Sequence, residues 1–451
     1  MRLSMSMCAL LLAASASLSA AGAASAQTRM TVAPAAVRAA AQPAAALSLR
    51  DAIAPKARGV TIDENRIRTH VIRPSNTIGV LTDEGRGVVP ALQISPALAA
   101  KLQLKGHLDV AAFGAALDSA LVNNVAGYAV QLRQNGQTVY SGQRNWAKIP
   151  ADGGSTWSIN TQMHVASVSK LITAMAMTKL LDEKNISYDA KIIDYLPTYW
   201  AKGPNIDKIT FRELMTQTSG FSTGGSDSDY LFMKGKVAAG VPANKVGTYD
   251  YENMNFGLCR ILIAIINGDV DKDLHLQVLL APFNDPAWDD LTLQAYKNYV
   301  QAKVFAPAGV TNATLDHPAG DALAYGFPAG AGGWNSGDVS SYAGGAAWHL
   351  SASQMLDVMN AFRRKGTIMP TPRAIAMLDN GFGIDLIQDT PIGKLYNKNG
   401  RWQNGARAEQ SLAYFLPQNM ELVVLTNSPV SAQDTFFRNV VTQIYVDHIV
   451  Q

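Results

Sequence analysis

A serine and a lysine three residues apart carry the strongest chemical signal in this sequence. Ser167 and Lys170 precede the apolar run Leu171–Met177, and no other serine in the chain is followed by a lysine at that spacing. In a helix, residues three apart lie on neighbouring turns of one face, so the hydroxyl and the amine can share a proton. A serine hydroxyl is a weak nucleophile until a base takes its proton. The pair therefore predicts nucleophilic catalysis.

The residues around the lysine decide between this interpretation and a simpler one, in which Ser167 or Ser169 caps the helix and Lys170 reaches solvent. The run after Lys170 is apolar on nearly every side until Lys179, which predicts a helix buried at the centre of a domain. Burying an ammonium is costly, and the same desolvation favours a neutral lysine that accepts a proton. We therefore favour the catalytic interpretation.

Two downstream motifs supply partners for the serine. Tyr251-Glu252-Asn253 lies in a loop that enters a helix, and Lys398-Asn399-Gly400 lies between two strand patterns near the C-terminus. Tyrosine and lysine have reference pKa values near 10, so deprotonating either at neutral pH requires about 4 kcal/mol. One ammonium about 4 Å from a phenolate supplies up to about 4 kcal/mol at an effective dielectric near 20, and desolvation opposes this gain. At its upper bound, the stabilisation from two lysines beside Tyr251 is therefore large enough to make this tyrosine a base at neutral pH.

Taken in order, the three motifs resemble those of the class C β-lactamase and penicillin-binding-protein-like family of serine hydrolases. That family also includes esterases and D-aminopeptidases. The similarity covers roughly residues 107 to 449, and further segments support it: Ile209–Gly220, the glycine pair Gly344-Gly345, and Val423–Asn427.

The resemblance implies a role for each motif residue and an acyl-enzyme mechanism. Ser167 would be the nucleophile, with Lys170 and Tyr251 as candidate bases. Asn253 would hold the lysine and the acyl side of the substrate, and Lys398 would place positive charge beside the hydroxyl. By the same resemblance, the backbone N–H groups of Ser167 and Arg401 would form the oxyanion hole, and the adjoining positions Asn399, Gly400 and Arg401 would contact the substrate.

Two departures from the family pattern bear on activity. Glu252 brings a carboxylate next to the candidate tyrosine base and would disfavour its ionisation if it faced the site. Asn399 replaces a threonine, which removes the hydroxyl that meets a β-lactam carboxylate; Arg401 is a candidate replacement anchor, and a surface arginine is the simpler interpretation. We therefore expect carboxylesterase-type activity. A class C-type β-lactamase, a D-Ala or D-amino-acid peptidase and a non-catalytic binding or wall-sensing homologue remain alternatives.

The order of the elements predicts an α+β fold. A hairpin turning at Asn135-Gly136 precedes the buried helix, helical patterns fill the middle of the chain, and strand patterns return at 383–387, 410–416 and 421–425. We expect a β-lactamase/transpeptidase-like fold, with an antiparallel sheet formed from both chain ends, flanking helices and an inserted, mostly helical subdomain. Residues 107–451 would form this hydrolase domain.

The N-terminus has the features of an export signal. A positive charge at Arg2, an apolar stretch and the A-x-A site Ala24-Ser25-Ala26 predict a cleaved signal peptide over residues 1–26. Residues 27–106 would form an Ala- and Pro-rich tether, to about residue 58, and an N-terminal extension. The mature protein would be periplasmic or secreted, without a transmembrane anchor. Its one cysteine, Cys259, is expected to be buried in a helix.

Other function classes find less support. The net charge of +3 is spread without basic runs, which argues against nucleic-acid binding. Gly220-Phe221-Ser222-Thr223-Gly224 matches the nucleophile elbow of α/β-hydrolases, but a helical pattern and not a strand precedes it. The seven histidines are scattered. We therefore expect no metal and no organic cofactor, and a small-molecule or peptidoglycan-like substrate.

Overall fold

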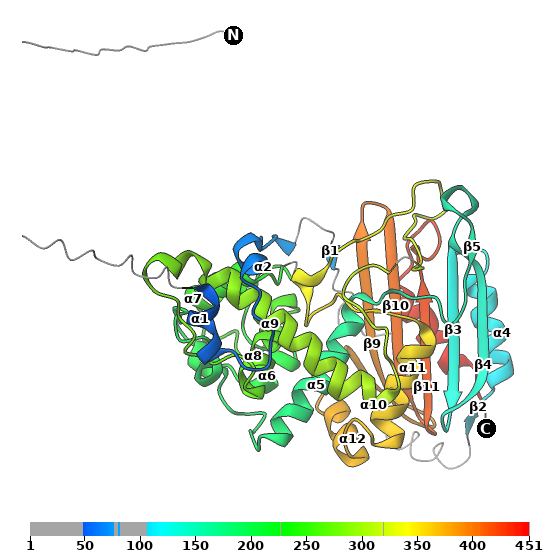
Figure 1. Cartoon of the computed structure of the whole chain (residues 1–451). Helices are drawn as coiled ribbons and strands as arrows, with labels where there is room; N and C mark the ends of the chain where they lie inside the picture. The colour runs from blue at the N-terminus through cyan, green and yellow to red at the C-terminus, as the bar shows by residue number, and fades with distance from the viewer. Residues whose placement is uncertain (1–47, 76–79, 82–105, 226, 319, 451) are drawn as a thin grey trace, which may run out of the picture. The chain divides into compact units, whose positions relative to one another are not determined.

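An antiparallel sheet joins the two ends of the chain in the computed structural model, which describes residues 48–75, 80–81, 106–225, 227–318 and 320–450. The strand order is β1-β9-β10-β11-β3-β4-β5, and β8 pairs with β9. Figure 1 shows the cyan N-terminal hairpin beside the orange and red C-terminal strands. The expected fold class is confirmed. The strands are β1 Val80–Leu81, β3 Gly127–Gln134, β4 Gln137–Lys148, β5 Ser155–Thr156, β8 Leu386–Thr390, β9 Gly393–Asn404, β10 Arg407–Leu416 and β11 Met420–Thr426.

The contact between β3 and β11 closes this sheet. Leu132 of the N-terminal hairpin lies opposite Leu422 of the C-terminal strand. The hairpin turns at Asn135 and Gly136, whose φ angles of 51° and 80° are both positive. A two-residue turn of this kind matches the twist of the flanking strands and explains the Asn-Gly sequence. The predicted hairpin is therefore confirmed.

Helices cover both faces of the sheet, so β11 is buried along its whole length. Leu422 and Val424 pack in one apolar cluster with helices α4 (Val110–Leu121) and α13 (Phe437–Asp447). Val423 and Leu425 point to the opposite face and join the larger cluster of the helical lobe. The two-residue period of a strand thus separates two cores.

Helix α5 (Ser169–Glu183) runs through the larger core, and 12 of its 15 residues are buried. It packs against α8 (Asn253–Asn267) and α9 (Asn284–Val300). The helix predicted to be buried is therefore confirmed, and Cys259 of α8 is buried as expected. The single turn η4 (Ala166–Val168) precedes α5 and follows β6 (Met163–His164).

The remaining elements are short, and most lie in the helical lobe. They are α1 Leu49–Ile53, η1 Ala54–Lys56, α2 Glu64–Thr69, β2 His107–Leu108, η3 Pro150–Asp152, η5 Ile192–Tyr195, η6 Ile206–Lys208, α6 Phe211–Met215, α7 Tyr230–Ala239, η7 Val278–Phe283, η8 Gln301–Phe305, α10 Ala306–Ala308, η9 Ser340–Tyr342, β7 His349–Leu350, α11 Ala352–Asn360, η10 Ala361–Lys365, α12 Thr371–Asp379 and β12 Ile449–Val450.

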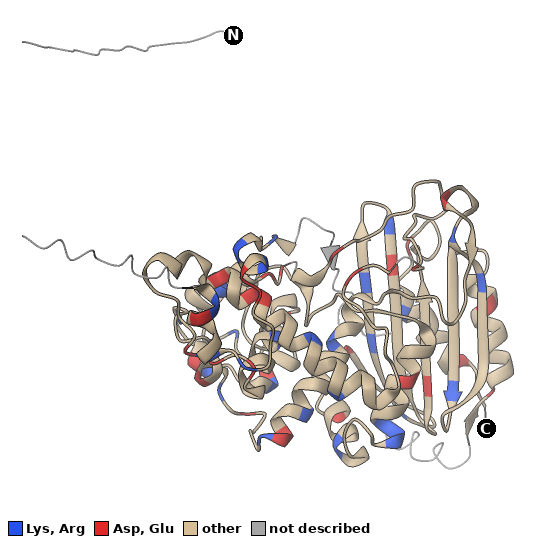
Figure 2. Ribbon diagram, in the orientation of Figure 1, with Lys and Arg blue, Asp and Glu red and all other residues tan. Residues whose placement is uncertain are grey.

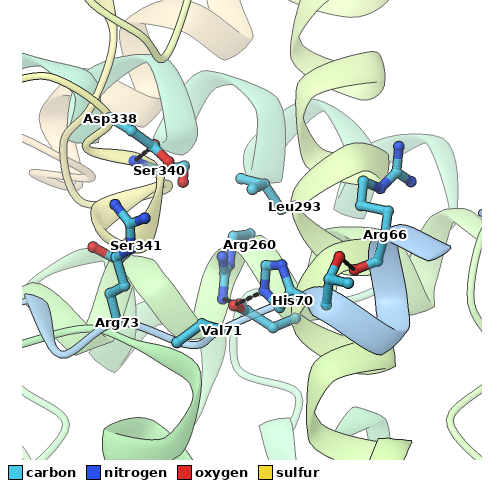
Figure 3. A pocket seen from close by; sticks show the side chains of 11 residues that line it. Arg66, His70, Val71, Arg73, Arg260, Leu293, Asp338, Ser340 and Ser341 are labelled. Carbon is cyan, nitrogen blue, oxygen red and sulfur yellow. Dashed lines mark hydrogen bonds and ion pairs between the residues drawn. The ribbon is translucent and has the colours of Figure 1, made fainter.

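The segment before the sheet is partly folded onto the helical lobe. Leu49, Ile53 and Ile67 are buried in the larger core. Two ion pairs add to this contact. Arg66 Nε lies 2.6 Å from Asp290, and His70 Nε2 lies 2.9 Å from Asp289, a pair marked by a dashed line at His70 in Figure 3. The tether predicted to reach residue 58 is therefore wrong for residues 48–58. The predicted signal peptide and residues 27–47 lie outside the described residues.

Charged residues of both signs are interspersed over the helices and the sheet (Figure 2). Within the described part of the chain, no helix combines the length and the apolar character needed to cross a bilayer.

Candidate active site

Ser167, Lys170 and Tyr251 meet through hydrogen bonds. The Ser167 Oγ atom lies 2.6 Å from the Tyr251 hydroxyl and 3.0 Å from Lys170 Nζ. The three side chains come from the turn η4, helix α5 and the loop before α8. Their residues are 2%, 1% and 6% exposed, so the groups interact where water screens them little. The structure therefore brings together the candidate nucleophile and both candidate bases.

The backbone before the nucleophile is held in an unfavourable conformation. Ala166 has a φ of 45°, in the left-handed region that residues with a Cβ seldom adopt. Hydrogen bonds on both sides of Val165 fix this turn: its N–H donates to Trp348 O at 2.9 Å and its carbonyl accepts from Ser411 Oγ at 2.6 Å. Strain of this kind persists where the surroundings enforce it, and it is concentrated at functional sites.

The nitrogen of Lys170 is oriented by two carbonyl acceptors. Lys170 Nζ donates to Asn253 Oδ1 at 2.7 Å and to the carbonyl of Gly345 at 2.8 Å. These two bonds direct the third substituent of the nitrogen, an N–H or a lone pair, toward Ser167 Oγ. The arrangement therefore suits the ammonium, as a donor, and the neutral amine, as a base. The Asn253 amide donates in turn to the carbonyl of Gly225, so this residue positions the lysine.

Lys398 reaches the site from β9, and its positive charge is paired with a carboxylate. Its Nζ lies 5.6 Å from the centre of the Tyr251 ring and donates to Asp385 Oδ2 at 2.6 Å. The same carboxylate oxygen accepts from the backbone N–H of Asn399 at 3.0 Å. The Asp385 charge offsets much of the stabilisation that the sequence led us to expect from a second lysine. Lys398 nevertheless lies where the motif predicts it.

Glu252 turns away from the tyrosine base. Its carboxylate accepts hydrogen bonds from the backbone N–H and the hydroxyl of Thr223, and burial raises the pKa of this carboxyl. Its own N–H donates to Gln217 Oε1 at 3.1 Å. Gln217 also accepts from Asn255 Nδ2 at 2.6 Å and so supports the loop that carries Tyr251. The carboxylate therefore does not face Tyr251, and the condition under which it would disfavour ionisation of this tyrosine is not met.

Strand β9 presents its backbone to the nucleophile. A methyl group built on Gly400 would lie 2.7 Å from Ser167 N and 2.6 Å from Val165 O, so only glycine fits this approach. On this edge β9 pairs with β8 as far as residue 397 and with β1 from residue 402, which leaves 398–401 without a strand partner among the described residues. The motif lies inside this strand and not between strands, which corrects the sequence-based placement. The expected oxyanion donor, the N–H of Arg401, belongs to this part of β9.

The side chains of Asn399 and Arg401 lie on the opposite face of β9 from Gly400. Asn399 Oδ1 accepts from Arg438 Nη1 at 3.2 Å, and Arg401 Nη1 donates to Asp434 at 2.8 Å. The structure thus ties both side chains to groups of the chain itself, and the expected contact of positions 399 and 401 with the substrate stays a prediction. Arg401 is 7% exposed, so the surface interpretation is wrong.

Sequence reasoning missed three groups that support the site. They are the Asp385 carboxylate on Lys398, the carbonyl of Gly345 on Lys170, and the side chain of Gln217. The Gly344-Gly345 pair was the one available signal. Gly344 has a φ of 95°, and its carbonyl accepts from Thr173 Oγ1 at 2.7 Å, so the pair brings two backbone acceptors to α5.

The alternative nucleophile, Ser222, does not lie in an elbow. It is exposed in the loop between α6 and α7, and no strand precedes it. The structure therefore agrees with rejecting this motif.

Comparison with known proteins places these features in a family. The β-lactamase family profile matches residues 115–446. The esterase/β-lactamase LipL of Mycobacterium tuberculosis is 28% identical over 155 residues, 33% of this chain and 35% of LipL. The putative penicillin-binding protein PbpX of Bacillus subtilis is 25% identical over 158 residues, 34% of this chain and 32% of PbpX. Each of these matches thus spans about a third of the curated relative.

A solved structure extends the likeness over most of the domain. The β-lactamase/D-alanine carboxypeptidase of Pseudomonas syringae superposes with a TM-score of 0.57 at 14% identity, over 75% of this chain and 98% of that one. At this identity the likeness establishes the fold. Together with the family match over residues 115–446, it shows that the chain belongs to the β-lactamase family of serine hydrolases.

Proposed function

We propose that the protein is an exported serine hydrolase that cleaves a carboxylic ester or a related amide through an acyl-enzyme on Ser167, with esters as the preferred class. The observation that carries this proposal is the position of Ser167 Oγ, within 2.6 Å of the Tyr251 hydroxyl and 3.0 Å of Lys170 Nζ. A serine buried between two groups that can accept its proton is the arrangement that nucleophilic catalysis requires.

Acylation begins with transfer of the Ser167 proton to Tyr251 or Lys170 as Oγ attacks the substrate carbonyl. The carbonyl oxygen becomes negative and is stabilised by the N–H of Ser167, at the positive end of α5, and by the N–H of Arg401 on the β9 edge. The proton then passes to the leaving alcohol or amine as the C–O or C–N bond breaks. A water molecule, deprotonated by the same base, attacks the ester on Ser167. The bond between the acyl carbon and Oγ then breaks, the base returns the proton to Oγ, and the acid is released.

The preference for esters rests on leaving group and anchoring. An alkoxide leaves more readily than an amide nitrogen. The β9 position that presents a hydroxyl to a β-lactam carboxylate in relatives is Asn399, which binds Arg438. LipL is named as both an esterase and a β-lactamase, which is compatible with such a site. A class C-type β-lactamase and a D-Ala or D-amino-acid peptidase are the alternatives, acting on a small molecule or a peptidoglycan-like substrate.

A substrate panel on the purified protein tests the proposal. We expect hydrolysis of short-chain nitrophenyl esters, weak turnover of a chromogenic cephalosporin, and labelling of Ser167 by a fluorophosphonate. Ser167→Ala should abolish labelling and hydrolysis, whereas the exposed Ser222→Ala should retain both. Labelling at Ser222 would contradict the mechanism. Efficient cephalosporin turnover with poor ester hydrolysis would favour a β-lactamase, and a folded protein that neither labels nor turns over would favour a binding homologue.

Export is the second part of the proposal and rests on the signal-peptide pattern of residues 1–26. In a cell with a matching secretion system, N-terminal sequencing of the accumulated protein should give Gln27 as the first residue. Protein that keeps Met1 in the cytoplasm would contradict export.

A further inference from the structure

Five ionisable side chains gather in the interior, apart from the hydrogen-bonded catalytic groups. His349 lies 3.9 Å from Asp321 through Nε2, and His317 lies 4.0 Å from the same Asp321 oxygen through Nδ1. His164 packs against His349, with ring centres 5.1 Å apart, and its Nδ1 lies 3.4 Å from Glu409. Each of these side chains is at most 5% exposed.

These groups lack the hydrogen bonds that burial demands. Six buried atoms have no hydrogen-bond partner among the residues that the structure describes: both Asp321 oxygens, both Glu409 oxygens, His317 Nδ1 and His349 Nε2. Unpaired buried polar groups are rare in native proteins, and an ionised carboxylate without a partner is costly. The cluster therefore calls for a further cation.

The orientation of the His349 ring leaves one nitrogen ready to bind a metal. Its Nδ1 lies 3.1 Å from the carbonyl of Ala347, which requires a proton on Nδ1. The lone pair is then on Nε2, which faces Asp321. A histidine whose second ring nitrogen donates to a backbone carbonyl is typical of metal ligands.

From this geometry we infer that His317 Nδ1, His349 Nε2 and the Asp321 carboxylate form a buried site for one divalent transition metal ion, with Zn²⁺ as the best fit. The three ligand atoms lie within 4.8 Å of one another. Atoms bound at about 2.0 to 2.1 Å in a tetrahedral site lie roughly 3.4 Å apart, so binding needs only a small contraction. Two imidazoles and one carboxylate are ligands that Zn²⁺ takes readily.

Glu409 and His164 complete the site as its second layer. The backbone N–H of Ala347 donates to His164 Nε2 at 3.1 Å, so the proton of this ring is on Nδ1, beside Glu409. His164 is therefore not a ligand through either nitrogen. The two carboxylates together balance the double charge of the ion.

The position of the site suggests a structural role. His349 of β7 pairs with His164 of β6, and His164 lies three residues before Ser167. A metal ion here would brace the strand pair from which the strained turn at Ala166 emerges. The sequence gives no hint of this, because His317 and Asp321 stand in a loop 28 residues or more from His349.

Metal analysis of the untagged, full-length protein tests the inference without depending on hydrolase activity. After dialysis, elemental analysis should find about one zinc per chain. His317→Gln and Asp321→Asn should each lower Zn²⁺ affinity by at least tenfold, whereas the exposed His107→Gln should not. A chain that holds no metal and shows no heat of Zn²⁺ binding, or variants that bind as tightly as the unaltered protein, would overturn the site. Iron or manganese in place of zinc would overturn the choice of metal.

A measurement on the unaltered protein guards against variants that do not fold. Removal of the metal by a chelator should lower the melting temperature, and added Zn²⁺ should restore it, because a ligand that binds only the folded state stabilises it. Co²⁺ added to the stripped protein should give the visible absorption of a tetrahedral complex. A melting temperature indifferent to both chelator and Zn²⁺, or Co²⁺ that remains spectroscopically free, would contradict the inference.

Discussion

Lys398 and Asp385 form a buried ion pair next to Tyr251, a candidate base. The ammonium donates to Asp385 Oδ2 at 2.6 Å, and the two side chains are 1% and 9% exposed. The carboxylate keeps the lysine oriented toward Tyr251 while it offsets part of its charge. The field at Tyr251 is therefore set by a balance of three groups, Lys170, Lys398 and Asp385, and not by two lysines.

Asp385→Asn should shift this balance. With the carboxylate neutralised, the charge of Lys398 stabilises the deprotonated base more strongly, so the acid limb of the kcat/KM profile should move to lower pH. Breaking a buried pair costs about 3–5 kcal/mol, and the remaining amide acceptor should keep the loss near the lower figure. The pH profile and urea unfolding measure the two effects.

Asp379→Asn is the matched control. Asp379 pairs with Lys394, which lies on β9 as Lys398 does, but both side chains of this pair are 43% exposed. It should cost less than about 1 kcal/mol and leave the pH profile in place. An acid limb that moves to higher pH in Asp385→Asn would contradict the role assigned to Lys398.

Tyr251→Phe and Lys170→Ala should each lower kcat by about 100-fold or more, the usual contribution of a general acid-base group. Lys170→Ala should also destabilise the fold by about 1–3 kcal/mol, because Asn253 Oδ1 and the carbonyl of Gly345 lose their donor. Steady-state kinetics and thermal melts separate the two effects. Tyr414→Phe, which removes a buried hydroxyl bonded to Thr442, should keep its activity. Near-normal turnover by Tyr251→Phe would assign the base to Lys170.

Glu252→Gln should change how stability depends on pH. Burial raises the pKa of this carboxyl in the folded protein above its value in the unfolded chain. The folded state therefore holds the proton more tightly, and the associated stability is present below about pH 4.5 and is lost as pH rises through the folded pKa. A glutamine can still accept from the Thr223 N–H and donate to its hydroxyl.

The expected result for Glu252→Gln is a melting temperature that equals that of the unaltered protein near pH 4 and exceeds it near pH 8. Activity should change little, because the carboxylate faces the Thr223 loop. A variant that loses stability at pH 8, or whose acid limb shifts, would show that the carboxylate acts on Tyr251 after all.

Gly400→Ala should abolish activity. Its methyl group would lie 2.7 Å from both Ser167 N and Ser411 Oγ, so β9 must retreat from the nucleophile and the oxyanion donors must separate. Gly235→Ala is the control, since this helical glycine of α7 has open space around it and should gain up to about 1 kcal/mol. Kinetics and thermal melts of both variants provide the check. Retained turnover by Gly400→Ala would exclude the β9 edge from the oxyanion site.

The elements that the sequence predicted are those with a local signal. The apolar run after Lys170 specified a buried helix, and Asn135-Gly136 specified the hairpin turn. The start of α6 is also determined locally, because Thr210 and Glu213 form the reciprocal hydrogen bonds of a capping box. In each case a few neighbouring residues determine the conformation.

What could not be read depends on partners distant in sequence. Strand β9 was missed because Asn397-Lys398-Asn399-Gly400 contains residues that are depleted in strands. Alternation along this strand, once recognised, places Lys398 and Gly400 on one face and Asn399 and Arg401 on the other. Asp385 is held beside Lys398 by a backbone hydrogen bond, in which its N–H donates to the carbonyl of Asn397 at 2.9 Å. No sequence spacing predicts this contact.

The pairing of β3 with β11 also limits when the sheet can form during synthesis of the chain. Gln134 pairs with Met420, so the sheet cannot close until the chain has been synthesised beyond residue 420. Long-range pairing of this kind makes folding slow and leaves apolar strands exposed in the meantime. Ser167 lies between β3 and β11 in the sequence, and Gly400, its neighbour in the folded protein, is synthesised more than 200 residues later. A nascent chain that has not yet reached β9 therefore carries Ser167 without the strand that lies against it in the folded protein.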